Sequence, residues 1–214
     1  MKMKRILGAA LCAAMLLVST SCSPLLRFVF SSGKDSASSD EYVVSDDFGY
    51  SDDLTSSYDA ASSDAQTVKE YGNETVGWMT LDDTFFQWYT PGNTDTCVQY
   101  AQSPTEIVTM DVFDCAAIKE QTGVDFDAYA AASSRLYQLQ QASQTENIEK
   151  LTGSREGLGS YAAYQVYCYY PDDDQYLVMW YMDSPDQTKV YYVAAEFRST
   201  EMSFFNYAQT YRMP

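Results

Sequence analysis

The chain has 214 residues, of which 30 are acidic and 13 are basic, and it contains no histidine. Its formal net charge of −17 opposes binding to DNA or RNA, because nucleic-acid affinity depends on Lys and Arg side chains that neutralise phosphates. The lack of histidine excludes a Ser-His-Asp triad, a Cys-His dyad and any histidine-built zinc site.

The first 21 residues have the pattern of a secretion signal. Three basic side chains lie within the first five positions, and residues 6–18 carry no charge. This apolar run is shorter than the roughly 20 residues that a helix needs to cross a bilayer. Small residues then precede Cys22, so we expect cleavage directly before this cysteine.

The residues around the expected cleavage point, Val18-Ser19-Thr20-Ser21-Cys22, resemble a bacterial lipobox. The resemblance implies a thioether-linked diacylglycerol on Cys22, and an acyl chain on the new amine, as the only non-protein group. Two or three chains anchor a protein stably where a single chain does not. We therefore expect a lipid-anchored protein on the extracytoplasmic face of a bacterial cell membrane. An ordinary secretory signal followed by a chance cysteine stays the alternative.

Residues 22–66 are expected to form an acidic, Ser-rich, disordered tether. Residues 31–66 contain 11 Ser, nine Asp or Glu and one Lys, a composition that buries too little apolar surface to fold. Residues 25–30 are more apolar and could lie against the lipid headgroups. Without residues 1–21 the chain has 10 basic and 30 acidic residues, a net charge of −20, which favours cationic partners and metal ions over anionic lipids.

Residues 67–214 have the composition of one globular domain. The hydrophobic patterns predict strands at 75–81, 97–101 and 107–113, a helix at 125–142 with Asp125 as its N-cap, strands at 161–170, 176–182 and 189–197, and a closing helix at 199–212. Both alternating sets of residues in strand 176–182 are apolar. We therefore expect a central antiparallel sheet that is covered on both faces.

This order of elements resembles the PsbP-like α/β/α sandwich. The resemblance rests on Val76-Gly77-Trp78, Val98-Gln99-Tyr100, Tyr161-Ala162-Ala163-Tyr164-Gln165-Val166 and Phe204-Phe205. It implies an α+β fold with a six- or seven-stranded antiparallel sheet flanked by helices. DcrB-type lipoproteins, the photosystem protein PsbP and a Ran-binding nucleotide-release factor share that fold. Its members serve mostly as non-catalytic protein-binding modules, and none of their functional residues matches a position here.

Tyrosine is abundant in the second half of the domain. An exposed row of tyrosines could bind a protein or a glycan, because the side chain offers both apolar area and a hydroxyl. The residues that we propose for such a binding face are Tyr164, Tyr169, Tyr181 and Tyr191. Packing between the sheet and a helix is the alternative.

Two groups of carboxylates are candidates for chemistry. Asp172, Asp173 and Asp174 are adjacent at an expected hairpin tip and are a weak candidate for Ca²⁺, although a calcium loop spaces its ligands at alternate positions. A solvated turn is the favoured interpretation, and no metal is expected. The pairs Asp82 with Asp83 and Asp111 with Asp114 could serve a glycosidase, but such pairs arise by chance in an acidic chain.

Three cysteines, Cys97, Cys115 and Cys168, fall in the domain. An odd number does not form a disulfide framework. Cys97 and Cys168 lie in expected strands and should be core residues, whereas Cys115 follows a strand and is the candidate for a reactive thiol.

These patterns favour a membrane-anchored lipoprotein whose domain binds another protein without catalysis. An extracytoplasmic receptor for a small molecule or glycan is the alternative, and a hydrolase without histidine ranks last.

Overall fold

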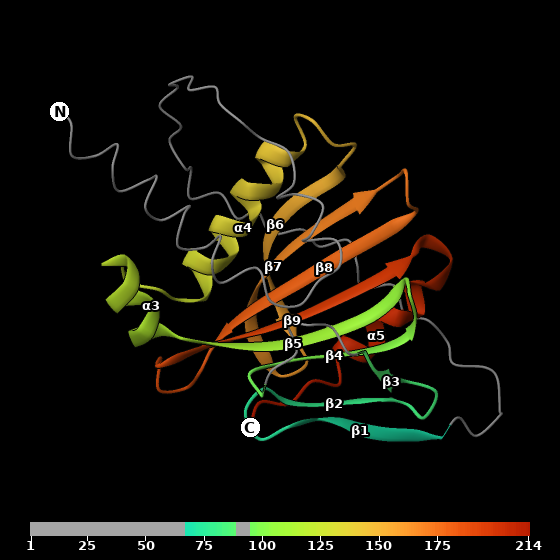
Figure 1. Cartoon of the computed structure of the whole chain (residues 1–214), viewed down its shortest axis with the longest axis horizontal. Helices are drawn as coiled ribbons and strands as arrows, with labels where there is room; N and C mark the ends of the chain where they lie inside the picture. Colours follow the sequence, from blue (N-terminus) through green and yellow to red (C-terminus); the bar gives the residue numbers. More distant parts are fainter. Residues whose placement is uncertain (1–66, 89–94) are drawn as a thin grey trace.

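The computed structural model describes residues 67–88 and 95–214, which build a seven-stranded antiparallel sheet with further elements on both faces (Figure 1). In spatial order its strands are β3 (Phe86–Gln87), β4 (Cys97–Ser103), β5 (Glu106–Asp114), β9 (Lys189–Arg198), β8 (Gln175–Asp183), β7 (Tyr161–Tyr170) and β6 (Glu149–Leu158). The predicted α+β class, with an antiparallel sheet flanked by helices, is confirmed.

Helix α4 (Ala128–Ala142) covers one face of the sheet, where it packs against β6, β7 and β8 (Figure 1). Its buried positions recur every three or four residues and form one stripe: Ala128, Ala131, Ala132, Arg135, Leu139 and Ala142. The helix starts later than predicted, because the Asp127 carboxylate accepts a hydrogen bond from the Ala130 amide at 2.7 Å. Asp125 is not the N-cap; it forms an ion pair with Lys119 of the preceding helix α3 (Cys115–Thr122).

The opposite face is covered by a β-hairpin and by the C-terminal helical turns. The hairpin pairs β1 (Val68–Asn73) with β2 (Gly77–Asp82), where only one strand was predicted. The predicted helix at 199–212 is a 3₁₀ helix, η1 (Ser199–Phe204), followed by the single turn α5 (Phe205–Ala208). Non-helical dihedral angles at Glu201 (φ −114°, ψ 40°) interrupt the helical path. Trp180 and Phe197 are fully buried in the core on this face.

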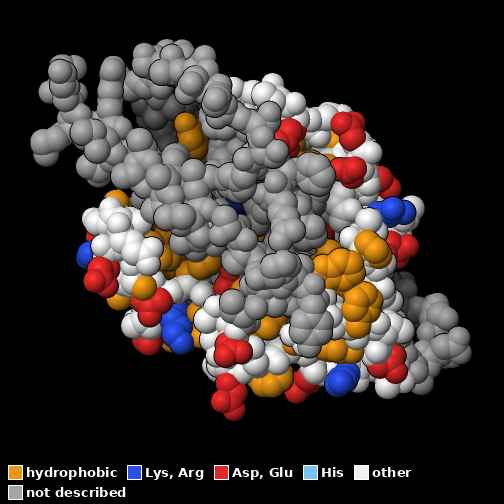
Figure 2. Space-filling view, viewed as in Figure 1, with side chains coloured by type: hydrophobic (Ala, Val, Ile, Leu, Met, Phe, Trp, Pro, Cys, Tyr) orange, Lys and Arg blue, Asp and Glu red, His pale blue; other side chains and the backbone are white. Residues whose placement is uncertain are grey.

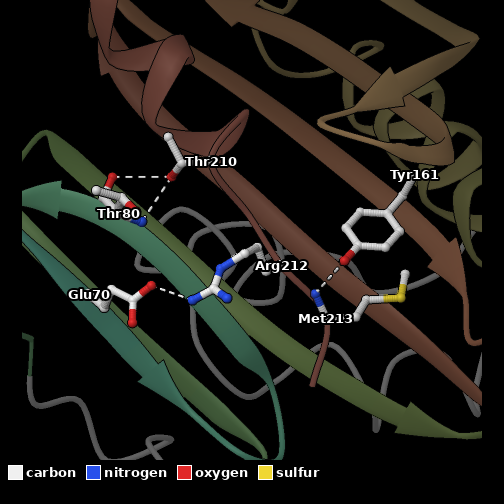
Figure 3. A network of polar contacts seen from close by, with 6 residues as sticks. All are labelled: Glu70, Thr80, Tyr161, Thr210, Arg212 and Met213. Atoms are coloured by element: carbon white, nitrogen blue, oxygen red, sulfur yellow. Dashed lines mark hydrogen bonds and ion pairs between the residues drawn. The ribbon is translucent and has the colours of Figure 1, made fainter.

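The last residues tie the hairpin to the rest of the domain (Figure 3). Trp78 and Arg212 exchange two backbone hydrogen bonds of 2.9 and 2.8 Å, and the Arg212 guanidinium pairs with Glu70 on β1. Thr210 Oγ1 accepts from the Thr80 amide at 2.9 Å and donates to the Thr80 carbonyl at 3.1 Å. We call residues 209–214 the C-terminal clasp, because they pair with β2 although about 130 residues separate them in sequence.

The turn between β8 and β9 contains a carboxylate whose charge stabilises the fold. Hydrogen bonds from Ser184, at 2.6 Å, and from Thr188 lower the pKa of Asp186 to about 2. Because the folded pKa is below the unfolded value, this stabilisation is complete above about pH 4 and is lost as the pH falls towards 2. We expect Asp186→Asn to lower the unfolding midpoint at pH 7, and this difference from the wild type to shrink between pH 4 and 2. Urea titrations at several pH values would measure it, and a difference that is constant with pH would contradict it.

The predicted signal segment (1–21), the tether (22–66) and Cys22 lie outside the described residues. Within the described ranges, no helix combines the length and the apolar character that crossing a bilayer requires.

Candidate functional site

Polar side chains interrupt the apolar pattern on one half of the sheet. They lie on the three neighbouring strands β4, β5 and β9, and we call them the polar strip: Gln99, Thr109, Asp111, Tyr192 and Glu196. Register places Gln99 opposite Thr109 and Asp111 opposite Tyr192. Cross-strand partners point to the same face, so the polar strip is one surface.

The polar strip lies on the same face as α4 but beyond the strands that α4 covers. Phe113 belongs to the same alternating set as Asp111, and its ring packs against Phe126, which directly precedes α4, at 6.0 Å. The packing of α4 lies mainly against β6, β7 and β8 (Figure 1). The helix therefore covers one half of this face and leaves the half formed by β4, β5 and β9 to the polar strip.

Charges of both signs meet beside Tyr192. Arg135 projects from the buried stripe of α4 and is only 7% exposed. Burial raises the pKa of Tyr192 well above its ordinary value; the neighbouring Tyr181 raises it further, Arg135 lowers it, and Glu196 and Asp111 make smaller contributions that raise it. Glu196 is 2% exposed and Asp111 is 7% exposed, and the Asp111 carboxylate accepts a hydrogen bond from the Val112 amide at 2.7 Å. Buried carboxylates are stabilised by partners of this kind.

Gln99 indicates that the polar strip could take a ligand. Its side chain is fully buried, and Nε2 donates to Thr109 Oγ1 at 3.0 Å. The amide oxygen Oε1 is buried without a hydrogen-bond partner. A buried acceptor left unsatisfied costs about 1–3 kcal/mol, so a group that donates an N–H or O–H bond here would be favoured. The Gln99 amide oxygen is thus an acceptor that a bound donor would satisfy.

The four tyrosines predicted as a binding face do not form one surface. Tyr164 and Tyr181 are cross-strand partners on the α4 face, whereas Tyr169 and Tyr191 pack in the core on the opposite face. Tyr181 and Tyr191 are each only 6% exposed. The prediction of a single exposed row is therefore wrong, because alternate residues of a strand point to opposite sides of the sheet.

Tyr169 contributes to a local cluster instead of a ligand site. Lys150 Nζ donates to the Tyr176 hydroxyl at 2.7 Å and lies 5.0 Å from the centre of the Tyr169 ring. The Tyr169 hydroxyl donates to Asp174 at 2.9 Å. These contacts fix the turn between β7 and β8.

The three adjacent aspartates do lie in that turn, but their carboxylates do not converge. Asp172 accepts a hydrogen bond from Asn147 at 2.9 Å. Hydrogen bonds from Ser199 and Tyr169 lower the pKa of Asp174. Within residues 67–88 and 95–214, no group of three or more acidic or cysteine side chains is arranged to hold a metal ion. The weak calcium candidate therefore has no geometric support.

The carboxylate pairs considered for a glycosidase are also separated. Asp82 is buried and accepts a hydrogen bond from the Tyr207 hydroxyl, while Asp83 is exposed. Asp114 caps α3 by accepting from the Ala117 amide at 2.8 Å, away from Asp111. Neither pair flanks a common space.

The cysteines of the domain are not activated. Cys97 and Cys168 are buried in strands, as predicted, and burial raises the pKa of Cys168 to about 11. Cys115 and Cys168 are free thiols. Partial burial and the carboxylates of Asp183 and Asp114 raise the pKa of Cys115. The proposal of Cys115 as a reactive thiol is therefore not supported, because the thiolate is the nucleophile.

Acidic side chains are spread over the visible surface of the domain, with few basic ones between them (Figure 2). This distribution agrees with the net charge. The polar strip, with the unsatisfied amide oxygen of Gln99, is therefore the candidate site.

No family model matches the chain, and no curated protein matches it. Among solved structures, PsbP from the cyanobacterium Synechocystis aligns with a TM-score of 0.48 at 12% identity, covering 73% of this chain and 98% of that protein. The Saccharomyces cerevisiae Ran-binding protein Mog1p gives 0.39 at 14% identity, with coverages of 70% and 86%. LpqN, involved in cell envelope biogenesis of Mycobacterium tuberculosis, gives 0.36 at 14%, with coverages of 68% and 89%. All three TM-scores are below 0.5, so these similarities carry no argument about function.

Proposed function

We propose that the protein is a lipoprotein, anchored through Cys22 on the extracytoplasmic face of a bacterial membrane, and that its domain is a non-catalytic module that binds another protein. The anchor is supported by the lipobox-like residues before Cys22 and by the uncharged run that precedes them. The absence of histidine from the chain and the separation of the carboxylate pairs support a role in binding over hydrolysis.

The observation that carries the binding role is the polar strip. Its fully buried Gln99 leaves the amide oxygen Oε1 without a hydrogen-bond partner. A partner segment that donates an N–H or O–H bond to this oxygen would complement it.

Removing the unsatisfied acceptor should weaken partner capture. We expect the mature lipoprotein with Gln99→Leu to retain its partner about fivefold more weakly, because a neutral hydrogen bond contributes about 0.5–1.5 kcal/mol. Affinity capture from surface extracts, quantified by mass spectrometry, measures this loss. The matched control is Asp173→Asn, which removes an exposed carboxylate from the β7–β8 turn and should change nothing. Equal recovery with both proteins would refute the assignment of the site.

The anchor is tested separately. We expect the wild type to incorporate labelled palmitate and to sediment with membranes, and Cys22→Ser to lose both properties while residues 67–214 fold unchanged. Wild-type protein that is isolated without label, or with residues 1–21 still attached, would exclude the lipoprotein assignment.

A further inference from the structure

We propose that the outer edge of β6 is an interface between two copies of this chain, which pair antiparallel through their β6 strands and extend the sheet across a two-fold axis. β6 ends the sheet, and β7 and β8 separate it from the strands that carry the polar strip. The interface therefore leaves the polar strip open to another protein, and the inference goes beyond the proposed function without depending on it.

The outer edge of β6 carries backbone groups that no other strand uses. A two-residue turn with φ = +57° at Gly159 joins β6 to β7, so Leu158 and Tyr161, which close this turn, share both of their backbone hydrogen bonds. Every second residue back from Leu158 then bonds to β7. The residues in between direct their N–H and C=O groups outward: Gly153, Arg155 and Gly157. Within residues 67–88 and 95–214, these outward groups have no hydrogen-bond partner.

β6 is a long and regular edge strand. The other edge of the sheet, β3, is only two residues long, and a short edge strand is one of the ways in which proteins prevent pairing with another chain. β6 pairs with β7 without a register shift from Thr152 to Leu158, and it contains no proline. The Arg155 guanidinium lies 5.9 Å from the centre of the Tyr164 ring, so its charge is held over the face of the sheet and not across the edge.

Gly157 is a glycine that the domain itself does not require. Its φ is not positive, so a residue with a side chain could adopt the same backbone conformation. A β-carbon there would meet only the Tyr161 carbonyl oxygen, at an ordinary contact distance of 3.7 Å. Glycine weakens the interior of a strand, and it is typical of positions where another backbone approaches closely. Because Gly157 directs its own backbone outward, that approach comes from the open edge.

The charges of β6 favour a second copy of the same strand as the occupant. β6 contains two basic and two acidic side chains, so its net charge is zero in a chain whose net charge is −17. Two copies of this acidic chain can therefore approach at β6 with little local repulsion. Outward residues pair with outward residues in an antiparallel ladder, so the two-fold axis must pass through a residue of the strand.

An axis at Ser154 keeps like charges apart. An axis at Arg155 would place two guanidinium groups opposite each other, and an axis at Glu156 would do the same with two carboxylates. With the axis at Ser154, Arg155 lies opposite Gly153 of the partner subunit. Glu156 then lies opposite Thr152 of the partner subunit. The small Ser154 side chain suits the axis, because the Cα atoms of a non-hydrogen-bonded pair approach to about 4.5 Å.

Sedimentation equilibrium of residues 22–214 with Cys22→Ser, which needs no detergent, tests the interface. One strand pair makes a small interface, so we expect a dimer with a Kd of about 100 μM. Thr152 is exposed, and Thr152→Lys should tighten the dimer about fivefold while Thr152→Glu weakens it about fivefold, because the axis repeats the pair with Glu156. Gln121→Lys and Gln121→Glu make the same charge changes on the exposed surface of α3 and should shift the Kd by less than about twofold.

Hydrogen exchange locates the contact without a substitution. The amides of Gly153, Arg155 and Gly157 should exchange more slowly as the concentration rises through the Kd. The amides of Ser154 and Glu156, which bond to β7, should not change. A parent that stays monomeric at about 1 mM would overturn the proposal and leave the β6 edge to a different protein. Thr152 variants that shift the Kd in the same direction, or protection confined to residues outside β6, would also overturn it, and none of these results would alter partner capture by the polar strip.

Discussion

Gly77→Ala is expected to detach the C-terminal clasp and to lower the free energy of unfolding by about 3 kcal/mol, the sum expected from backbone strain and a steric clash. Gly77 has φ = +94°, a conformation that side chains of L-residues rarely adopt. A β-carbon at this position would collide with the Arg212 carbonyl oxygen and would lie 2.8 Å from the Tyr211 hydroxyl. Tyr211 would then lose its 2.7 Å hydrogen bond to the Val76 carbonyl, and the Trp78–Arg212 bridge would open.

A matched control separates strain from collision. Gly123 ends α3 with φ = +73°, and a β-carbon there meets no atom within 4 Å. Gly123→Ala should therefore cost only the backbone strain, about 1 kcal/mol. Urea denaturation measures both losses, and hydrogen exchange should report faster exchange of the Trp78 and Arg212 amides in Gly77→Ala alone. Losses of equal size in the two variants would show that the clasp does not constrain the hairpin.

Much of the sheet could be predicted from the sequence, because its central strands are long aromatic and β-branched runs between clear turn residues. β7, β8 and β9 lie within one or two residues of their predicted bounds. The apolar character of both alternating sets in β8 correctly indicated layers on both sides of the sheet. The local hydrophobic pattern is therefore sufficient to predict these three strands.

The elements that the sequence did not reveal depend on tertiary contacts. β6 contains Gly153, Gly157 and charged residues, and it pairs as an edge strand with β7. The residues from Ser199 onward have a helical apolar period, but the clasp draws Thr210 and Arg212 into bonds with β2 after one turn of α5. Long-range pairing overrides local propensity in both cases.

Part of the candidate site could be predicted from the sequence, but the abundance of tyrosine directed the prediction to other residues. Thr109 and Asp111 interrupt the apolar strand at 107–113, but their importance depends on Gln99 and Glu196, which lie on other strands of the same face. Arg135 carries a stronger signal, since a charged residue in the buried stripe of a helix is rare. The four tyrosines were chosen by their number and not by strand parity, which separates them onto two faces.

Trp180→Ala is expected to be the most destabilising single substitution in the sheet, with a loss of about 3–5 kcal/mol. The indole is completely buried in the core that β8 shares with the hairpin and the C-terminal turns, and its ring lies 5.3 Å from that of Phe205. Its Nε1 is buried without a hydrogen-bond partner. Replacing the indole by a phenylalanine ring therefore breaks no hydrogen bond. Trp180→Phe should therefore cost less than about 2 kcal/mol, mainly through lost volume. Chemical denaturation distinguishes the two variants, and equal losses would mean that the N–H group, and not packing volume, stabilises this core.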